Sequence, residues 1–500
     1  MERGLGGAAT ALALVLAACG AGGGDDATGA TAAIAGGHVG ARAVAVIDEP
    51  LILNDVLSHG EVVIGLASRT MDLEGGVVVR SEDGGVSWTT AETPLADALA
   101  EGPFSYWEIA PDRPALRGDG GWVVATRTAP VAPGSFFAVQ AVAISDDVGV
   151  TWEAVELPAP DGTVGLVHAA AAVGGDLLLG GAVQELPSAD EPPLGGQEAF
   201  EQRRAAYDAA IWRVAADGTV TREAEVQFDG RPDAQAIRYL EVVDDRVVAF
   251  GGDAAGRPLQ CCFLDLPPAT WSSSDGGETW ASLPGLSESP TSGLYEAPTR
   301  DGGALVLQVG IDRLRLEPGG DRWGPVVLPE EQWPDAKAVS VGADEEVLTW
   351  VEDVACDCAE AMGGRVGAGE VTDRVPLELP ACADTSPRGF TRVERPIVMG
   401  GVVVALAYCD HHGGHAVGLA WTADAGRSWD TTRLTDLAST IGAEDLYLPY
   451  GWPEPPILAS GDEVLVLLSA PSAGPPSRRD GRPEPAPLAA VHLRPEPRRG

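Results

Sequence analysis

Lysine is nearly absent from this chain of 500 residues, and Lys337 is its single example. Phosphate-binding loops and Schiff-base enzymes depend on a lysine side chain, so the sequence argues against both classes. Positive charge is scarce as a whole, because 33 basic residues stand against 74 acidic ones and the formal net charge is -41. A surface so acidic repels phosphate backbones, so we expect no nucleic-acid partner. The acidity itself indicates solubility, with cation attraction or a salt-rich habitat as alternatives.

Long apolar runs and helical patterns are missing as well. No uninterrupted apolar stretch reaches the length of about 18 residues that a membrane-spanning helix needs. A helical pattern is confined to residues 197–208, where it predicts one or two turns inside a loop. The serine-hydrolase elbow, the His-Glu-x-x-His zinc motif and the Walker loop are also absent. With 64 Gly, 39 Pro and short apolar runs at regular intervals, the sequence predicts an all-β fold.

One eight-residue motif, by contrast, occurs four times, at residues 81–88, 145–152, 273–280 and 422–429. An Asp or Ser side chain that accepts hydrogen bonds from the backbone N–H groups ahead of it closes a tight loop, and a Gly supplies a position with positive φ. Because apolar residues precede every copy, the motif predicts a hairpin turn between two strands. Each copy keeps a hydroxyl residue, an Asp, a Gly and a Trp at fixed offsets: Ser81, Asp83, Gly85 and Trp88; Ser145, Asp147, Gly149 and Trp152; Ser273, Asp275, Gly277 and Trp280; and Thr422, Asp424, Gly426 and Trp429.

This wording resembles the Asp-box, or bacterial neuraminidase repeat, SxDxGxTW, and the resemblance covers residues 41–495. It implies a β-propeller of four-stranded blades, in which each box joins the third strand of a blade to the fourth and its Trp packs between neighbouring sheets. Sialidases, the sortilin head and the photosystem II assembly factor are families with such boxes. In the first the propeller is catalytic, and in the other two it is a recognition platform.

The spacing of the copies predicts a ring of eight blades, with seven as the alternative. The successive gaps are 64 residues from Asp83 to Asp147, 128 from Asp147 to Asp275 and 149 from Asp275 to Asp424. Degenerate copies at 214–220, 316–323 and 366–372 occupy the two larger gaps. Residues 488–493 form a third strand that no fourth strand follows, so we expect the apolar residues 41–47 to complete that last blade. Eight apolar runs predict the second strands: 62–67, 122–128, 177–182, 246–251, 304–309, 347–351, 402–408 and 464–468.

The N-terminus predicts export and a lipid anchor. Residues 1–18 have the build of a signal peptide, and the sequence Leu-Ala-Ala-Cys-Gly at 16–20 resembles the bacterial lipobox. The resemblance implies a diacylglyceryl group on Cys19, with an ordinary secretory signal as the alternative. Residues 19–40 then form a flexible linker and residues 41–500 the propeller. We expect the protein in the cell envelope on the extracytoplasmic side, with membrane contact through the anchor only.

Six further cysteines are an even number, which in an exported protein favours disulfides. The order of the chain favours Cys356 or Cys358 with Cys382, and the remaining one of the first two with Cys409. Cys261 and Cys262 are adjacent, so they form a vicinal bridge, stay free or pair outward. A metal site is the alternative near Cys409, because Asp410, His411, His412 and His415 follow it, but the spacing matches no standard zinc signature. We therefore predict neither a metal nor a cofactor.

The lengths of the loops predict which face of the propeller binds a ligand. The long insertions at 184–208, 253–267, 352–365, 410–415 and 470–487 all connect a second strand to a third, which places them on the face opposite the boxes. Loops on a rigid scaffold are where function concentrates. Aromatic residues between blades would stack on sugar or peptide there, or plug the ring: Tyr106, Trp107, Tyr447, Tyr450 and Trp452.

Whether the chain could be an enzyme of the sialidase type depends on the positions of its arginines. A sialidase resemblance implies three arginines that meet on a carboxylate, a Tyr nucleophile and an early Arg-Ile-Pro phrase, and that phrase is absent. The sequence therefore favours a non-catalytic binding or scaffold module for a glycan, a peptide or an envelope protein, with an exo-sialidase as the alternative. For that alternative the candidate residues are Arg69, Arg127, Arg238, Tyr447 and Tyr450.

Overall fold

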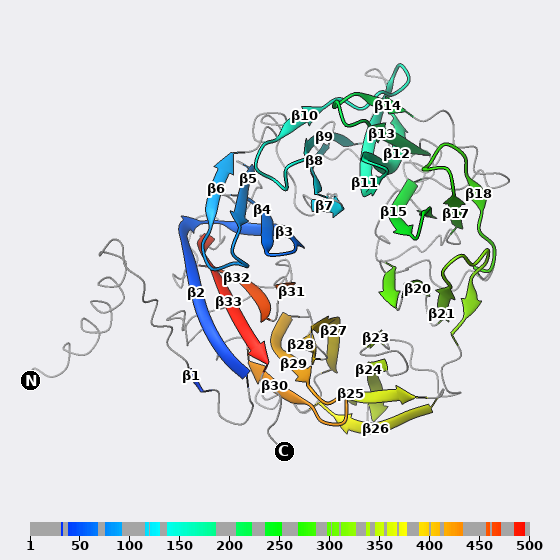
Figure 1. Cartoon of the computed structure of the whole chain (residues 1–500). Helices are drawn as coiled ribbons and strands as arrows, with labels where there is room; N and C mark the ends of the chain where they lie inside the picture. The colour runs from blue at the N-terminus through cyan, green and yellow to red at the C-terminus, as the bar shows by residue number, and fades with distance from the viewer. Residues whose placement is uncertain are drawn as a thin grey trace, which may run out of the picture.

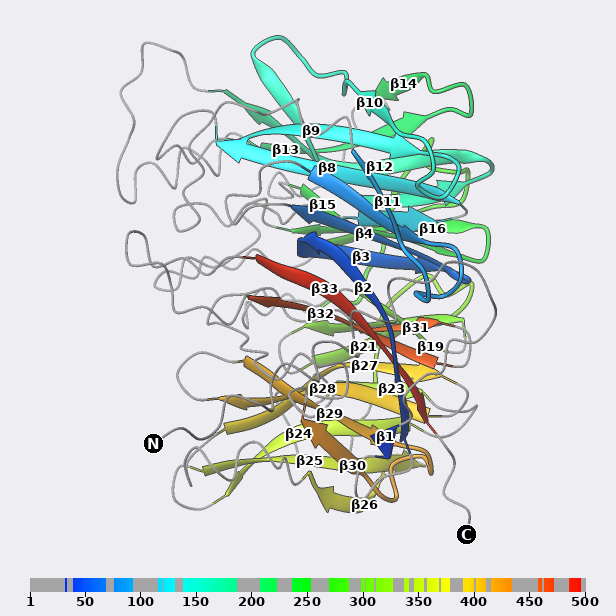
Figure 2. The ribbon, with the colours of Figure 1, turned by 90° about the vertical axis from the view of Figure 1, so that its left-hand side faces the viewer.

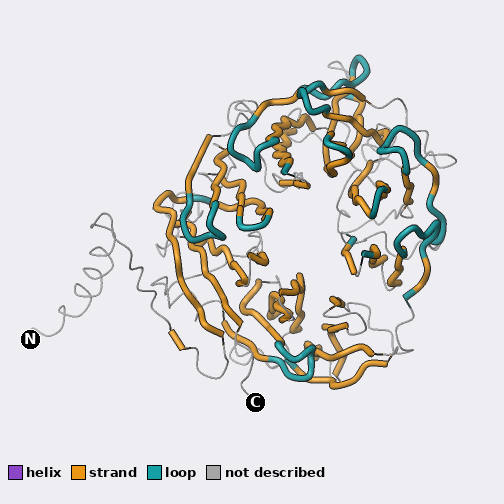
Figure 3. The backbone as a smooth tube through the Cα atoms, viewed as in Figure 1, coloured by secondary structure: helices purple, strands orange, loops and turns teal. Residues whose placement is uncertain are grey.

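All regular structure in the described part of the chain is β-strand. The structure is a computed structural model that describes residues 32–33, 39–68, 76–92, 116–119, 121–130, 138–186, 207–222, 236–252, 269–286, 298–301, 303–309, 312–326, 337–340, 346–354, 358–367, 370–377, 390–399, 402–410, 415–433, 457–460, 463–471 and 485–495. Within these residues there is no helix long and apolar enough to cross a membrane. Figure 3 shows strands and loops only in this part of the chain.

The strands form eight antiparallel sheets, numbered here in chain order. Sheet 1 contains β3 (Ile52–His59), β4 (Val62–Ser68), β5 (Gly76–Ser81) and β6 (Thr89–Glu92). Sheet 2 contains β7 (Leu116–Asp119), β8 (Trp122–Pro130), β9 (Ala138–Ser145) and β10 (Glu153–Val155). Sheet 3 contains β11 (Thr163–Val173), β12 (Asp176–Glu185), β13 (Tyr207–Val214) and β14 (Val220–Arg222). Sheet 4 contains β15 (Ala236–Val243), β16 (Arg246–Gly252), β17 (Ala269–Ser273) and β18 (Ala281–Ser282).

The second half of the chain repeats this plan. Sheet 5 contains β19 (Thr299–Asp301), β20 (Ala304–Val309), β21 (Asp312–Leu316) and β22 (Gly324–Pro325). Sheet 6 contains β23 (Lys337–Ser340), β24 (Glu346–Val354), β25 (Cys358–Gly367) and β26 (Glu370–Pro376). Sheet 7 contains β27 (Phe390–Met399), β28 (Val402–Asp410), β29 (His415–Thr422) and β30 (Asp430–Arg433). Sheet 8 has five strands, β31 (Ile457–Ser460), β32 (Glu463–Pro471), β33 (Pro485–Pro495), β2 (Val39–Pro50) and β1 (Ala32–Ala33).

The sheets stand in a ring, which is a β-propeller arrangement (Figure 1). The first strand of each sheet lies nearest the centre of the ring, as β3, β11, β15 and β27 show, and the last strand lies at the outside. All eight apolar runs that the sequence assigns to second strands fall in second strands, β4, β8, β12, β16, β20, β24, β28 and β32. The all-β class and the propeller arrangement are therefore confirmed.

The core lies between neighbouring sheets rather than within one of them. One cluster of buried side chains joins Ile64 and Val78 of sheet 1 to Val123 and Ala143 of sheet 2. Another joins sheets 4 and 5 around Phe250 and the fully buried Trp323. Burial of apolar area stabilises a fold by about 25 cal/mol per Å², so the sheets that share these clusters stabilise one another.

The N-terminal strand closes the ring. β2 pairs antiparallel with β33, from Val39 opposite Pro495 to Ile47 opposite Leu488. The sequence predicts this pairing, and the structure confirms it. Without β2 the outer edge of β33 would present unpaired backbone N–H and C=O groups, which is the usual route to edge-to-edge association.

Strand directions divide the connections between two faces. In sheets 1 to 7 the first and third strands end, and the second and fourth strands begin, at the same end of the sheet, which we call the turn face. Second and fourth strands end, and first and third strands begin, at the other end of the strands, which we call the loop face (Figure 2). This division is the one that the sequence predicts.

Two details of the sequence prediction are wrong. The insertion at 352–365 is mostly strand, because β24 and β25 pair up to Val354 opposite Cys358 and leave only residues 355–357 to connect them. A continuous hairpin satisfies the backbone polar groups that a loop would have to expose to water. Tyr207 and Asp208, at the end of the expected helical segment, belong to β13, where they pair with Gln184 and Val183. Residues 197–206 lie outside the described residues.

Candidate functional site

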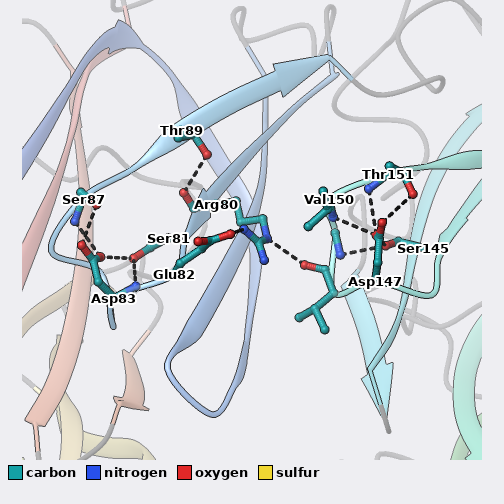
Figure 4. A network of polar contacts seen from close by, with 12 residues as sticks. Arg80, Ser81, Glu82, Asp83, Ser87, Thr89, Ser145, Asp147, Val150 and Thr151 are labelled. Atoms are coloured by element: carbon teal, nitrogen blue, oxygen red, sulfur yellow. Dashed lines mark hydrogen bonds and ion pairs between the residues drawn. The ribbon is translucent and has the colours of Figure 1, made fainter.

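Each repeat turn is organised by one Asp carboxylate. In the turn at residues 145–152, Asp147 Oδ1 accepts hydrogen bonds from the backbone N–H of Val150 at 3.0 Å and of Thr151 at 2.8 Å. Asp147 Oδ2 accepts one from the Thr151 hydroxyl at 2.6 Å. The Ser145 hydroxyl donates to Asp147 at 2.8 Å and accepts from the Gly149 N–H at 2.7 Å. Figure 4 shows this network beside the matching one around Asp83. Ser273 and Thr422 begin the same pattern in the other two turns.

The hydrogen bonds shift the titration of these carboxyls. Partial burial raises the pKa of Asp147, but the bonds from Thr151, Ser145 and Val150 outweigh it and the pKa is lowered from 3.8. The pKa of Asp83 is lowered in the same way. For Asp275 the bonds from Thr279 and Ser273 are the main cause, and they lower the pKa further. Carboxylates so fully engaged in their own turn serve structure and are not free to act as acids or bases at neutral pH.

Two successive residues of each turn have positive φ, whereas the sequence predicts only the second. The first of them is Gly84, Val148, Gly276 or Ala425, with φ of 73°, 58°, 77° and 57°. The second is the Gly of the motif, with φ between 80° and 98°. Val and Ala are strained in this region, since a left-handed conformation costs an L-residue about 1–2 kcal/mol.

The turn Gly and Trp contact the preceding sheet. A Cβ atom on Gly149 would lie 3.0 Å from Ile64 of β4, and one on Gly277 would lie 2.8 Å from Leu178 of β12. Trp152 packs in the cluster shared by sheets 1 and 2, and its Nε1 donates to the Gly149 carbonyl at 3.1 Å. Trp429 differs, because its buried Nε1 has no hydrogen-bond partner among the described residues. Trp88, Trp280 and Trp429 also lie against clusters of buried side chains.

Arginine side chains on one sheet also donate hydrogen bonds to backbone carbonyls in the turns of the next sheet. Arg80 of β5 donates from Nε to the Val148 carbonyl at 2.9 Å, which links sheet 1 to the turn of sheet 2. Arg213 of β13 donates to the Gly276 carbonyl at 2.7 Å and pairs with Asp176 at 3.1 Å. Arg246 of β16 donates to the Gly320 carbonyl in the degenerate turn of sheet 5. The repeat turns are therefore joints between sheets, and their polar groups are used within the fold.

A different set of polar residues lies on the innermost strands. Four first strands carry a β-bulge: between Leu53 and Asp55 in β3, Val167 and Ala169 in β11, Ile237 and Tyr239 in β15, and Glu394 and Ile397 in β27. The bulge faces the fifth and sixth residues of the second strand in sheets 1, 3 and 4. The residues that the bulge inserts between the register pairs are Asn54, His168, Arg238, and Arg395 with Pro396.

Because a bulge with a polar residue recurs in four first strands, we take the inner strands as the candidate site. Bulges occur preferentially beside active and binding sites, where they redirect a side chain. Here four bulges bring Asn, His and two Arg to the strands nearest the ring centre (Figure 1). In a chain with a net charge of -41, His168, Arg238 and Arg395 thus place basic residue types on three of these inner strands.

The bulge of β11 is held in place by Gln140 of the neighbouring sheet and by Gly181 of its own sheet. The side chain of Gln140 in β9 accepts a hydrogen bond from the Val167 N–H at 2.6 Å and donates to the Val167 carbonyl at 3.2 Å. Gly181, which pairs with Val167, lies against the Leu166 carbonyl so closely that no Cβ atom fits. His168 is buried at 7% exposure, whereas Arg238 on the next sheet is half-buried. The backbone on either side of His168 is thus fixed by the Gln140 hydrogen bonds and by close packing.

The structure places part of the predicted site. Arg238 lies on innermost β15, and Arg127 lies on β8, the second strand of sheet 2, so sheet 3 separates them. Cys409, Asp410 and His415 lie at the loop-face ends of β28 and β29, with Cys409 opposite His415. Cys358 begins β25 at the same face of the neighbouring sheet. The other candidates lie outside the described residues: Cys19, Arg69, Tyr106, Trp107, Cys261, Cys262, Cys356, Cys382, His411, His412, Tyr447, Tyr450 and Trp452.

Sequence reasoning missed Asn54, His168, Arg395 and the clamp from Gln140. A signal for the bulges was present, since each polar residue interrupts an apolar strand, as in Leu-Val-His-Ala at 166–169 and Ala-Ile-Arg-Tyr at 236–239. No such signal existed for Gln140, because its partner is 27 residues away in another sheet.

No family model matches the chain, and no curated protein matches it. Solved structures that the comparison matches to the chain include a prolyl endopeptidase, which is 10% identical with a TM-score of 0.44. That match covers 85% of this chain and 55% of the endopeptidase. A phage phi92 endosialidase is 8% identical with a TM-score of 0.39, and the match covers 93% of this chain and 70% of that one. The Trypanosoma rangeli sialidase is 13% identical with a TM-score of 0.31, and the match covers 88% of this chain and 74% of that one. The chain therefore spans about half of the endopeptidase, and none of these likenesses assigns an activity.

Proposed function

We propose that this chain is a lipid-anchored, extracytoplasmic Asp-box propeller whose eight sheets are eight blades, and that it binds a glycan, a peptide or an envelope protein without catalysis. The anchor is the lipid on Cys19, and the head is the ring from residue 41 onward. The sortilin head and the photosystem II assembly factor are precedents for an Asp-box ring that recognises a partner without chemistry.

The observation that carries this proposal is the repeated bulge on the inner strands. In sheets 1, 3 and 4 the bulge falls at the same level of the second strand, and His168 and Arg238 occupy two of these positions on adjacent sheets. Sheet 7 carries a fourth bulge, at Arg395 and Pro396. Recognition sites in rigid folds are built in this way, from a few fixed polar groups on a scaffold that does not move. By contrast, the Asp carboxylates of the repeat turns are already engaged by their own hydroxyl and N–H groups.

The test is capture of a ligand by the chain that begins at residue 20. A glycan array, a peptide library and an envelope extract are probed with the wild-type protein, with Arg238→Ala and with the control Arg322→Ala, whose side chain is exposed on the turn face. We expect at least one probe to bind wild type and the control equally and Arg238→Ala at least tenfold more weakly, which corresponds to about 1.4 kcal/mol. Silence from all three probes, or equal binding by both variants, would contradict the proposal.

An exo-sialidase is the second candidate, and the position of Arg238 on an innermost strand favours it. An arginine there suits the carboxylate of a sialoside. The assay is turnover of a fluorogenic sialoside by the same protein. Turnover that Arg238→Ala or Tyr447→Phe abolishes would replace the binding proposal, whereas no turnover by wild type removes this candidate.

A further inference from the structure

The joint between the last sheet and the first is built like two other joints in the ring. At each of the three, the Gly of a repeat turn lies against an aliphatic residue on the second strand of the preceding sheet: Gly149 against Ile64, Gly277 against Leu178 and Gly85 against Leu465. The residues that pair with these aliphatic residues on the third strand are, in the same order, Arg80, Arg213 and His492. The joint that closes the ring thus carries an imidazole where the other two carry a guanidinium.

Each of the two arginines holds the next repeat turn through a backbone carbonyl. Arg80 donates to the Val148 carbonyl at 2.9 Å, and Arg213 donates to the Gly276 carbonyl at 2.7 Å. Val148 and Gly276 are the first residues with positive φ in their turns, and Gly84 holds that position in the turn of sheet 1. A guanidinium stays protonated up to about pH 12, so these two bonds do not depend on pH near neutrality.

His492 has a different relation to its turn. The residue is buried, with 2% exposure, and its Nδ1 lies 2.7 Å from Oε2 of Glu463, the first residue of β32. An ionised carboxylate only accepts hydrogen bonds, so the imidazole donates from Nδ1 and a neutral ring carries no proton on Nε2. The buried Nε2 has no hydrogen-bond partner among the described residues, and a Cβ atom on Gly85 would lie 3.2 Å from it. A second proton on the ring would therefore give this joint the donor toward the turn that the arginines supply elsewhere.

We propose that the ring is closed by a proton-dependent joint, in which protonated His492 pairs with Glu463 and donates from Nε2 to the turn of sheet 1. Histidine gains its charge between about pH 8 and about pH 5, with the proton taken from the solvent. Acidification across this range therefore tightens the contact between sheet 8 and sheet 1. The carboxylates of Asp83, Asp147 and Asp275 stay ionised throughout, because their pKa values lie below 3.8.

Charged residues of both signs stand around His492. Glu463 contacts the imidazole directly, and its attraction for an imidazolium is the strongest because Coulomb energy falls with distance. The turn of sheet 1 adds Glu82 and Asp83, which are both exposed. Against these stand Arg42, which pairs with His492 from β2, and Arg494, two residues further along β33. Carboxylates outnumber guanidinium groups here and a carboxylate is the group in contact, so a charged imidazole has a partner at this joint.

Hydrogen exchange of two matched repeat turns tests the proposal. The turn at residues 81–88 packs against His492, whereas Arg80 holds the turn at 145–152, which serves as an internal control in the same full-length protein. Exchange is followed by mass spectrometry at about pH 8 and about pH 5.5, on either side of the usual titration of histidine. The results are expressed as protection factors, which remove the intrinsic effect of pH on exchange.

Three variants accompany the wild-type protein. His492→Gln keeps a polar side chain that does not titrate. Glu463→Gln keeps the imidazole but removes its charged partner, at a position whose side chain is 24% exposed. His59→Gln changes an exposed histidine on the turn face and is the matched control.

In wild type and in His59→Gln we expect protection of the turn at 81–88 to be at least about threefold greater at the lower pH, because hydrogen bonds to charged groups are strong. The turn at 145–152 should be protected equally at both pH values, and in His492→Gln and Glu463→Gln both turns should be. Equal protection of the turn at 81–88 at the two pH values in wild type would overturn the proposal, as would a pH dependence that persists in His492→Gln. If His492→Gln fails to fold, Glu463→Gln decides the question, since a pH dependence that persists there also overturns the proposal.

Discussion

The Asp carboxylate is the residue on which each repeat turn depends. It accepts hydrogen bonds from the backbone N–H and the hydroxyl of the residue four positions later, as Asp147 does from Thr151. These bonds hold the loop without help from the rest of the sheet. The residue type and its offset were enough to predict this arrangement. The strained residue before the turn Gly was not predictable, since Val148 and Ala425 adopt positive φ where their side chains disfavour it.

Acid should weaken these turns. The pKa of Asp147 is lower in the folded protein than the 3.8 of an unperturbed Asp, so the folded state binds this proton less readily than the unfolded chain. The resulting stability is complete above about pH 5 and is lost as the pH falls through the folded pKa. Asp147→Asn should therefore be less stable than wild type at pH 6, and the difference should shrink towards pH 3. Urea unfolding across this range measures it, and a difference independent of pH would contradict the assignment.

A reciprocal exchange tests the strain at positive φ. Gly276 and Ala425 hold the same position in two turns, with φ of 77° and 57°. Gly276→Ala should lower the free energy of unfolding by about 1 kcal/mol, because a Cβ has space beside Val173 at 3.5 Å but the backbone resists it. Ala425→Gly should lower it less or raise it, because the strain is relieved. Equal losses in the two variants, measured by denaturant unfolding, would show that strain at this position is negligible.

At the scale of the element, the repeat turn and its Trp act as a joint between sheets. Trp152→Ala should cost about 3–5 kcal/mol, the usual loss when a core aromatic side chain is removed, because the ring packs between sheets 1 and 2. Val150→Ala in the same turn is the matched control and should change little, since Val150 is exposed at 55%. Chemical unfolding of both variants decides the point, and a loss below 1 kcal/mol for Trp152→Ala would contradict the role of the joint.

Elements with a local signal were predictable, and those set by distant partners were not. Second strands such as β12 and β28 are buried, so their sequences are near-continuous apolar runs. The hairpin of β24 and β25 was mistaken for an insertion, because the acidic residues and cysteines near residue 356 have the composition of a loop while their backbone pairs as a strand. Arg80 gave no sign of its bond to Val148, since 68 residues separate the two.

At the scale of the whole molecule, the ring is closed by a strand from the other end of the chain. Removal of residues 20–50 takes away β2 and exposes the edge of β33, so this variant should unfold at a lower temperature and associate edge to edge. Removal of residues 20–31 alone is the control and keeps both β1 and β2. Size-exclusion chromatography and thermal unfolding compare the two proteins. A monomeric variant without β2 that is as stable as the control would show that closure does not depend on β2.

The assignment of connections to the two faces of the ring could be predicted from the order and length of the loops in the sequence. The bulges on the inner strands could not. Long second-to-third strand connections mark the loop face without any structure. A bulge, however, is a property of two paired strands and has no signal in one of them alone. In β11 it is defined by the pairing of Val167 with Gly181 and of Ala169 with Gly180, with His168 between them. The candidate site therefore moved from the loops alone to the inner strands that support them.

The central claim is that recognition belongs to the inner strands and that the repeat turns hold the ring together. The affinity of the captured ligand, measured by calorimetry for Arg238→Ala and for still-folded Trp152→Ala, tests this claim most directly. We predict that Arg238→Ala weakens binding at least tenfold and leaves the unfolding curve nearly unchanged, while Trp152→Ala lowers stability and leaves the affinity at its wild-type value. The reverse result, a selective loss of binding in Trp152→Ala with Arg238→Ala unaffected, would contradict the account.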